Sequence, residues 1–210
     1  MPKRVDHGAR RREIAAAVAR IARDRGLQGV SFREVATEAG MSVSLVQHYF
    51  GSKENLLTGT LDIQSEVMGE RILRRLGELG PDPRPLDRLR TVARAFLPTD
   101  DESTAAMLLY HGFAAAALTD ESLRSAAAFR NGRNLLDFMA GQLALAHESG
   151  DLADGIVPQV AASALLALVL GLSLTVLLDQ SLPSDAEAVL DAHLGRLSRD
   201  GSAVGSARPD

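Results

Sequence analysis

Two short helix-like segments joined by three residues constrain the fold of this chain more than any other feature. They lie within "VSFREVATEAGMSVSLVQHYF", residues 30–50. Ser31 followed by Glu34 has the spacing of a capping box, so a helix is expected to begin directly after Ser31. Gly40 can adopt the positive φ of a helix C-cap or tight turn, and Ser42 is the expected N-cap of the next helix. This spacing predicts a helix-turn-helix unit.

The second helix of this unit is expected to have one buried face and one exposed face. Val46 and Phe50 lie four residues apart and should point inward together with Met41. The opposite face is expected to carry Val43, Ser44, Gln47 and His48, with Leu45 and Tyr49 at its flank. Either this face packs against the rest of the protein, or it contacts a partner molecule.

The segment before this unit is basic and amphipathic. Ile14, Val18 and Ile21 recur at steps of four and three, which predicts a helix over residues 9–25. Residues 1–53 contain ten Lys or Arg against five Asp or Glu, whereas the remaining 157 residues contain 13 against 22. This asymmetry favours an anionic partner such as nucleic acid for the first part only. A solvated, charged helix face would give the same balance.

The rest of the chain is also expected to be helical. A fourth helix should start after Ser52 and end at "GPDPRP", because three prolines in five positions cannot continue a helix. Further helices are predicted over residues 86–97, 103–117, 120–148, 156–178 and 184–198, the last with a capping box formed by Ser184 and Glu187. No strand alternation occurs, so the predicted fold class is all-α, with about nine helices. The tails, about 1–8 and 201–210, have a disordered composition.

Composition and motifs argue against several classes of protein. The chain has no cysteine, so it has no disulfide framework, thiolate nucleophile or cysteine-ligated zinc. The basic residues 2–12 are not followed by the apolar stretch of a signal peptide, which favours the cytoplasm. The five histidines are scattered, and no HExxH, GxSxG or Walker pattern occurs. We therefore expect no enzyme activity, no cofactor and no metal site.

Residues 9–57 resemble the DNA-binding domain of the tetracycline-repressor (TetR) family of bacterial regulators. The matching features are the basic helix, "SFREVATEAGMS" and "YFGSKENLL". The resemblance implies an N-terminal three-helix helix-turn-helix domain over residues 1–55. A C-terminal helical ligand-binding and dimerisation domain would follow over residues 56–200, with a disordered tail over 201–210.

The function that the resemblance implies is transcriptional repression. A homodimer would bind double-stranded DNA at a pseudo-palindromic operator and would be released by a small, largely apolar effector. Activation stays open, because the sign depends on where the operator lies relative to the promoter. The alternative is a helical ligand-binding or enzymatic protein whose basic N-terminal bundle is only structural.

The DNA contacts implied by the resemblance lie at the helix-turn-helix and at the start of the fourth helix. The candidate residues are Ser31, Arg33, Ser42, Val43, Ser44, Gln47, His48, Tyr49 and Lys53. Arg33 would reach guanine or phosphate, and Val43 a thymine methyl group. Tyr49 would reach a phosphate. Ordinary surface or packing roles are the alternatives for these side chains.

Two of these positions carry additional information. The family commonly has Tyr at the position of Gln47, and an amide there can bond adenine N6 and N7, so we expect Gln47 to read a base edge. The family also commonly has Gly or Pro at the position of Ser44 and Thr at that of Leu45. Lys53 matches the family lysine, although the chain uses 21 Arg and only two Lys. A lysine at a helix N-terminus is suited to bind a backbone phosphate.

The resemblance also implies a ligand cavity in the C-terminal domain. The candidate lining residues are Phe96, Met107, Tyr110, His111, Phe113, Asn134, Phe138 and Gln142. No motif supports this set, and such residues are more often core. His111 in particular fits a satisfied interior histidine.

The apolar run 156–178 is long enough to span a bilayer. Acidic residues flank it without nearby Lys or Arg, and it has no aromatic belt, so no membrane is expected. In the resembled family the last two helices form a four-helix dimer interface. We therefore expect a homodimer through helices near 156–179 and 184–198, with a monomeric core helix as the alternative.

Overall fold

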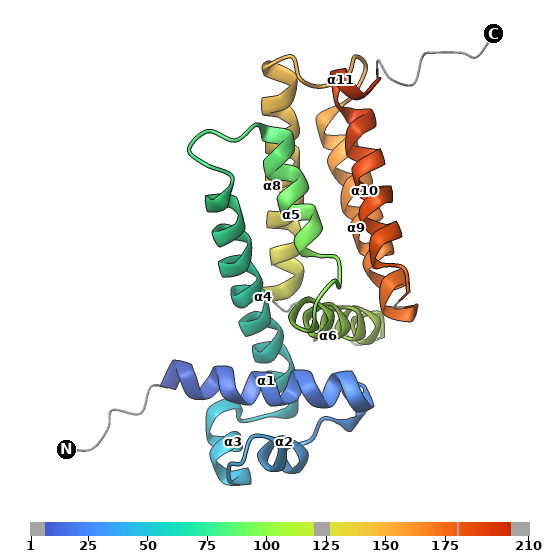
Figure 1. Cartoon of the computed structure of the whole chain (residues 1–210). Coiled ribbons are helices and arrows are strands. Elements are labelled where there is room, and N and C mark those ends of the chain that lie inside the picture. The colour runs from blue at the N-terminus through green and yellow to red at the C-terminus, as the bar shows by residue number, and fades with distance from the viewer. Residues whose placement is uncertain (1–6, 120–126, 180, 203–210) are drawn as a thin grey trace. The chain divides into compact units, whose positions relative to one another are not determined.

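A computed structural model of the chain describes residues 7–119, 127–179 and 181–202 (Figure 1). These residues form helices and turns, with one isolated antiparallel bridge between Leu152 and Ser198. The predicted all-α fold class is therefore confirmed.

The chain divides into two compact units. Unit 1 contains Met1–Met68 and Ala105–Asn131, and unit 2 contains Gly69–Thr104 and Gly132–Asp210. Unit 1 is thus larger than the predicted DNA-binding domain, because it adds a segment from the middle of the sequence. The boundary near residue 55, between a DNA-binding and a ligand-binding domain, stays a prediction.

Unit 1 is built around the three N-terminal helices. It contains α1 (His7–Arg25), the 3-10 turn η1 (Leu27–Gly29), α2 (Phe32–Glu38), α3 (Val43–Phe50), the first part of α4 (Lys53–Glu78) and most of α6 (Asp101–Ala117). Ile14 and Val18 of α1 share a core cluster with Val35 of α2 and Val46 of α3, all fully buried. The apolar stripes predicted from the sequence therefore form this core.

A second, smaller core cluster attaches α6 to the N-terminal helices within unit 1. Leu109 and Phe113 of α6 pack with Leu61 of α4, and Leu27 of η1 lies against the same cluster. The approach is close, because a Cβ added at Gly112 would lie 3.2 Å from Cδ1 of Leu27. The second half of α6 is thus part of the same compact unit as the helix-turn-helix.

Unit 2 contains the longer helices of the second half of the chain. They are the end of α4, α5 (Pro85–Ala95), most of α8 (Ala127–Glu148), α9 (Pro158–Leu178), α10 (Pro183–Leu197) and α11 (Arg199–Ser202). One buried cluster joins α5, α8, α9 and α10, which contribute Leu89, Met139, Leu165 and Leu190 in that order. The neighbouring helices α9 and α10 lie side by side in Figure 1.

Two details of unit 2 differ from the sequence prediction. Helix α10 begins at Pro183 with Leu182 as a cap that makes no side-chain hydrogen bond, so the predicted capping box at Ser184 is wrong. Proline is favoured at the first helical position, where its missing N–H would have no partner. Helix α11 was not predicted. The start of the predicted helix over 120–148 lies outside the described residues up to residue 126.

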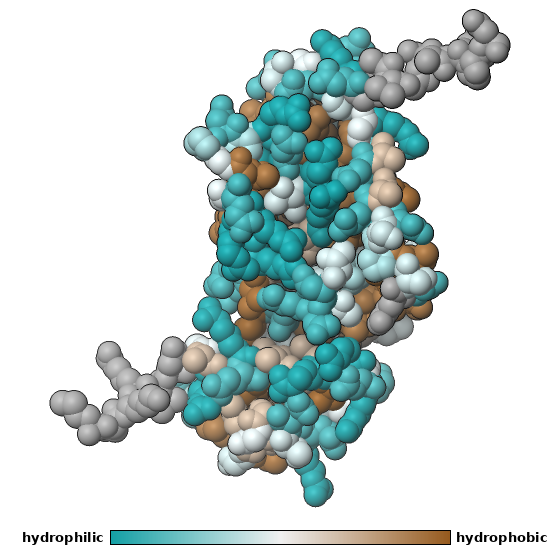
Figure 2. All heavy atoms as spheres, viewed as in Figure 1, coloured by the Kyte–Doolittle hydropathy of each residue, from teal (hydrophilic) through white to brown (hydrophobic). Residues whose placement is uncertain are grey.

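Helix α9 has one buried face and one exposed face, although it is apolar throughout. Ala162, Leu165 and Val169 are fully buried, whereas Val160 and Leu178 are 66% and 80% exposed. Figure 2 shows apolar atoms at the surface on the side where α9 and α10 lie. Among the described residues, α9 is the one helix with the length and composition to span a membrane, which is weak support for such a role. The exposed apolar face of α9 contacts either water, lipid or a partner molecule.

Candidate nucleic-acid interface

The helix-turn-helix is defined by local hydrogen bonds that its sequence provides. The Ser31 hydroxyl accepts from the Glu34 amide at 3.2 Å, and the Ser42 hydroxyl accepts from the Leu45 amide at 3.2 Å. Gly40 has a φ of +63°, which side chains other than glycine rarely adopt. The Met41 amide then donates to the carbonyl of Ala36 at 2.8 Å. These contacts make the turn between α2 and α3 short.

The two faces of α3 divide as the sequence predicts. Val46 and Phe50 are 0% and 5% exposed and pack in the unit 1 core together with Met41. The outward side chains are Val43, Ser44, Gln47 and His48, all of which are exposed. A face of hydroxyl, amide, imidazole and methyl groups is suited to the hydrogen-bonding groups and thymine methyls of the major groove.

Tyr49 lies at the flank of this face between two imidazole rings. Its ring centroid is 5.7 Å from that of His7 on α1 and 5.8 Å from that of His48. Its side chain is partly buried. These contacts limit the orientations of the phenol ring. Because the side chain is only partly buried, Tyr49 can pack against the two imidazoles and still direct its hydroxyl to a phosphate.

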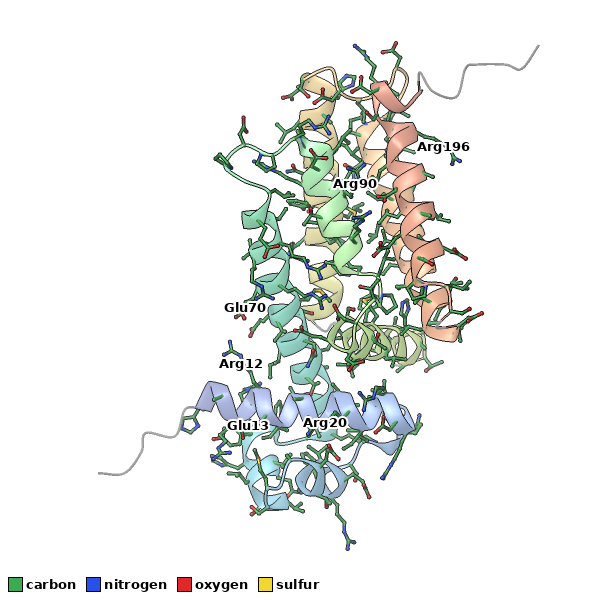
Figure 3. The ribbon with its side chains drawn as sticks, viewed as in Figure 1. Arg12, Glu13, Arg20, Glu70, Arg90 and Arg196 are labelled. Carbon is green, nitrogen blue, oxygen red and sulfur yellow. The ribbon has the colours of Figure 1, made fainter. Side chains whose placement is uncertain are left out.

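Most arginines of unit 1 that lie near α2 are paired with carboxylates. Arg20, labelled on α1 in Figure 3, donates to Glu38 of α2 at 2.5 Å, and Arg25 donates to Glu34 at 3.0 Å. Arg33, by contrast, is exposed in the first turn of α2 and has no ion pair within the part of the chain that is described. Arg33 therefore has donors for an external anion.

The start of α4 provides a second basic position. Lys53 is exposed as the first residue of this helix, and no described carboxylate pairs with it. The preceding Ser52 caps the helix by accepting from the Asn55 amide at 3.1 Å. A helix N-terminus with a lysine presents both amide dipoles and a full positive charge to a phosphate.

The predicted ligand residues of unit 1 are partly core. Met107 and Phe113 are 2% and 1% exposed, and Phe113 belongs to the cluster that attaches α6. Tyr110 and His111 form an edge-to-face pair with centroids 5.5 Å apart. Burial raises the pKa of the Tyr110 hydroxyl and lowers the pKa of the His111 imidazole. Both rings are therefore neutral near pH 7, as an apolar environment favours.

The predicted ligand residues of unit 2 differ in exposure. Phe96 and Phe138 pack against the unit 2 core, whereas Asn134 is exposed. Gln142 is 8% exposed, and its Oε1 has no hydrogen-bond partner among the described residues. A buried acceptor without a donor suits contact with a ligand donor or a water molecule. The ligand roles of all eight residues stay predictions.

A cleft of about 450 Å³ opens in unit 2 at the start of α5. Its lining consists of Leu79, Asp82, Pro83, Arg84, Asp87, Arg90, Thr91 and Arg94. Arg90, labelled in Figure 3, donates to Asp87 and to Asp191 of α10, each at 3.2 Å. Most of the positive charge in the cleft is thus compensated. Across the described residues, no group of three His, Asp or Glu side chains is arranged to hold a metal ion.

Sequence reasoning missed one buried polar group in unit 2. Arg71 of α4 donates both terminal nitrogens to the Asp100 carboxylate, which also accepts from Ser103. The helix predicted over 103–117 starts earlier, at Asp101, because Asp100 and Ser103 cap it. That spacing is a signal which the sequence analysis did not use, whereas no local pattern marks Arg71. Arg71 lies among the apolar positions of α4, one residue before Ile72.

Comparison with known proteins identifies both parts of the chain. Residues 14–59 match the family model described as bacterial regulatory proteins, tetR family. Residues 85–199 match the model of the C-terminal domain of BetI-type transcriptional repressors. The HTH-type transcriptional regulator PksA of Bacillus subtilis is 30% identical over 183 residues, which cover 85% of this chain and 84% of PksA.

Solved structures agree with these matches. A transcriptional regulator from Rhodococcus sp. Rha1 is 28% identical and superposes with a TM-score of 0.74, covering 89% of this chain and 95% of that one. The structure of AibR in complex with isovaleryl coenzyme A and operator DNA is 27% identical, with a TM-score of 0.68 and coverage of 90% and 97%. The family resemblance of the helix-turn-helix is therefore confirmed and extends over the C-terminal part. The chain belongs to the TetR family of bacterial transcriptional regulators, and its C-terminal domain is of the BetI type.

Proposed function

We propose that this regulator is a repressor that binds a pseudo-palindromic operator as a homodimer and is released by a small, largely apolar effector. The observation that carries the DNA-binding part is the exposed polar face of α3, held outward by the buried Val46 and Phe50. Gln47 and Val43 on this face would contact base edges, and Arg33 and Lys53 would contact the flanking backbone.

The dimer would form through α9 and α10. The exposed residues Val160, Ala164, Ala167, Gly171, Leu174 and Leu178 recur along α9 at steps of four and three. Such a stripe of apolar and small side chains matches the seam of a packed helix pair. A second copy of this chain would cover it, and the two-fold axis would place the two α3 helices in major grooves about 34 Å apart or a multiple of that.

A relative whose structure contains a ligand supports the effector part of the proposal. AibR, whose structure contains both a coenzyme A thioester and operator DNA, has the same architecture. For this chain, the buried and unpartnered Gln142 Oε1 and the neutral Tyr110–His111 pair are the polar groups that would orient a ligand. The effector would act through a difference in affinity for the DNA-binding and released conformations, in the cytoplasm.

The test is a selection of bound fragments from the host's genomic DNA at two salt concentrations. We expect a two-fold-symmetric site, with affinity that falls steeply as salt increases, because phosphate contacts release counterions. Sedimentation of the protein on the selected DNA should give an even number of chains per site. The proposal fails if no sequence is enriched at either salt concentration by protein that is free of copurified ligand.

A further inference from the structure

Arg71 is a charged residue at a buried position in unit 2. Its side chain is 7% exposed, although it lies in the middle of α4 rather than at a helix end. Its Nη1 donates to Oδ1 of Asp100 at 3.0 Å, and its Nη2 donates to Oδ2 of the same carboxylate. Glu102 lies 3.7 Å from Nη1. The planar guanidinium therefore makes a two-pronged contact, whose geometry is more restrictive than that of a lysine contact.

Asp100 is at the same time the N-terminal cap of α6. Its Oδ1 accepts from the amide and from the hydroxyl of Ser103, each at 2.8 Å. In return, the Ser103 hydroxyl accepts from the Asp100 amide at 3.2 Å. Ser103 is fully buried. This reciprocal pattern is a capping box, so the carboxylate that Arg71 binds is held rigidly by the first turn of α6.

The Arg71–Asp100 ion pair lies close to the places where the chain passes between the two units. Helix α4 passes from unit 1 to unit 2 between Met68 and Gly69, and α6 passes between Thr104 and Ala105. Arg71 is the third residue after the first passage, and Ser103 is the second residue before the second passage. Three described helices, α4, α6 and α8, contain residues of both units. The ion pair joins the first two of them close to the points where they pass from one unit to the other.

We propose that the Arg71–Asp100–Ser103 group is a clamp that makes α4 and α6 turn together where they enter unit 1, and that Arg71 is thereby a positioning residue for the DNA-binding helices. An apolar contact between two helices tolerates sliding and rotation. A bidentate pair to a capped helix end does not, because a small rotation breaks directional hydrogen bonds in a buried place. Hydrogen bonds from Arg71 and from Ser103 hold the pKa of Asp100 well below its usual range, so the clamp is charged at neutral pH.

The consequence for regulation rests on the proposed repressor function. A ligand that moved either helix in unit 2 would move both, and the motion would reach the helix-turn-helix through α4 and the packing of α6 within unit 1. Without the clamp, α4 would adopt a wider range of orientations relative to α6. The operator-bound arrangement would then form a smaller part of the population, and operator affinity would fall.

The test measures the arrangement of the two units directly. The chain has no cysteine, so spin labels can be placed at Thr37→Cys on α2 and Glu148→Cys on α8 without background. Both positions are exposed. Labelled chains are diluted into an excess of unlabelled chain, and the intramolecular distance distribution is measured by pulsed electron paramagnetic resonance. We expect Arg71→Leu and Asp100→Asn to broaden or split the distribution.

Two controls separate the clamp from general stability. Arg74→Leu removes the same charge from an exposed position of α4, and it should leave the distribution unchanged. Asn is a good N-cap, so Asp100→Asn keeps α6 capped while it removes the ion pair. Circular dichroism melts identify any variant that fails to fold. The clamp is refuted if Arg71→Leu and Asp100→Asn, both folded, give the parent distribution, even if their melting temperatures fall.

Operator binding gives the second readout. On the selected operator, Arg71→Leu should bind about tenfold more weakly than the parent, a change typical of coupling between sites, whereas Arg74→Leu should bind as the parent does. If the distributions broaden but the parent binds no DNA, the clamp stands and the proposed function fails. If operator affinity is unchanged despite broader distributions, Arg71 is not a positioning residue for DNA binding.

Discussion

Phe50 of α3 lies directly against Gly59 of α4. A Cβ added at Gly59 would be 2.9 Å from Cε1 and 3.2 Å from Cδ1 of the Phe50 ring. The guanidinium of Arg11 stacks over the same ring, 4.9 Å from its centroid. The absence of a side chain at residue 59 thus allows α4 to cross the C-terminal end of α3 closely.

Gly59→Ala should destabilise the protein, although alanine is the better helix former. Phe50 is 5% exposed and cannot move away without disturbing the unit 1 core, so we expect a loss of about 1–3 kcal/mol in the free energy of unfolding. Gly69→Ala on the same helix meets no atom within 4 Å. It should gain up to about 1 kcal/mol from helix propensity alone. Denaturant titrations of both variants check this contrast, and a stabilised Gly59→Ala protein would contradict it.

Gln47→Ala should relax sequence preference rather than weaken binding evenly. Its exposed carboxamide on α3 is suited to bond the N6 and N7 atoms of one adenine, so the variant should lose about 1–3 kcal/mol on the selected site and much less on a site changed at that base pair. Titration of both DNA fragments with parent and variant measures the difference. An equal loss on both fragments would assign Gln47 to the backbone instead.

Lys53→Ala should have the opposite signature. An exposed lysine at the start of α4 is suited to neutralise one phosphate, so its loss should weaken binding on all sequences and reduce the slope of log affinity against log salt by about one. Lys53→Arg should restore most of the slope. Arg74→Ala, exposed in unit 2, serves as the charge-matched control. A parent-like slope in Lys53→Ala would remove the phosphate role.

Leu174→Glu should dissociate the proposed dimer. This leucine is 43% exposed on the free face of α9, and burying a carboxylate there would cost about 3 kcal/mol, or roughly a hundredfold in the dissociation constant. Leu73→Glu is the control, because Leu73 is 69% exposed on α4. Sedimentation equilibrium distinguishes the two variants. If Leu174→Glu remains as dimeric as Leu73→Glu, the subunits associate through another surface.

Acid should weaken the protein partly through Asp100. Its pKa is lowered in the folded state, first by the hydrogen bond from Arg71, so the unfolded chain binds the proton more tightly. The stabilisation is therefore fully present above the unfolded pKa of about 3.9 and is lost as the pH falls toward the lower folded value. Asp100→Asn should show a smaller loss of melting temperature between about pH 5 and pH 2. Parallel curves for parent and variant would mean that the pair does not stabilise the fold.

The parts of the fold that the sequence predicted are those determined by neighbouring residues. Ser31, Gly40 and Ser42 act through hydrogen bonds and backbone angles within a few residues, so their spacing defined the helix-turn-helix. The start of α10 was misplaced for the same local reason, because Pro183 outweighs the weaker capping pattern at Ser184.

The parts that sequence reasoning missed depend on residues far apart in the chain. Arg71 is paired 29 positions away, and nothing in the local pattern distinguishes it from an ordinary charged residue of an amphipathic helix. The attachment of α6 to η1, in which Leu27 packs against the cluster that contains Leu109, joins residues still farther apart in the sequence. Apolar periodicity identified these helices but carries no information about which of them pack together.

The buried and the exposed residues of α3 have separate roles, and this separation affects how the DNA sequence that such a regulator binds can change in evolution. Val46 and Phe50 hold the helix in place, while Val43, Ser44, Gln47 and His48 carry almost none of the core. Substitutions on the outward face should therefore leave folding largely untouched. If the proposed function holds, a duplicated copy of this chain could acquire a new operator through a few point mutations at α3 without losing its partner subunit or its effector response.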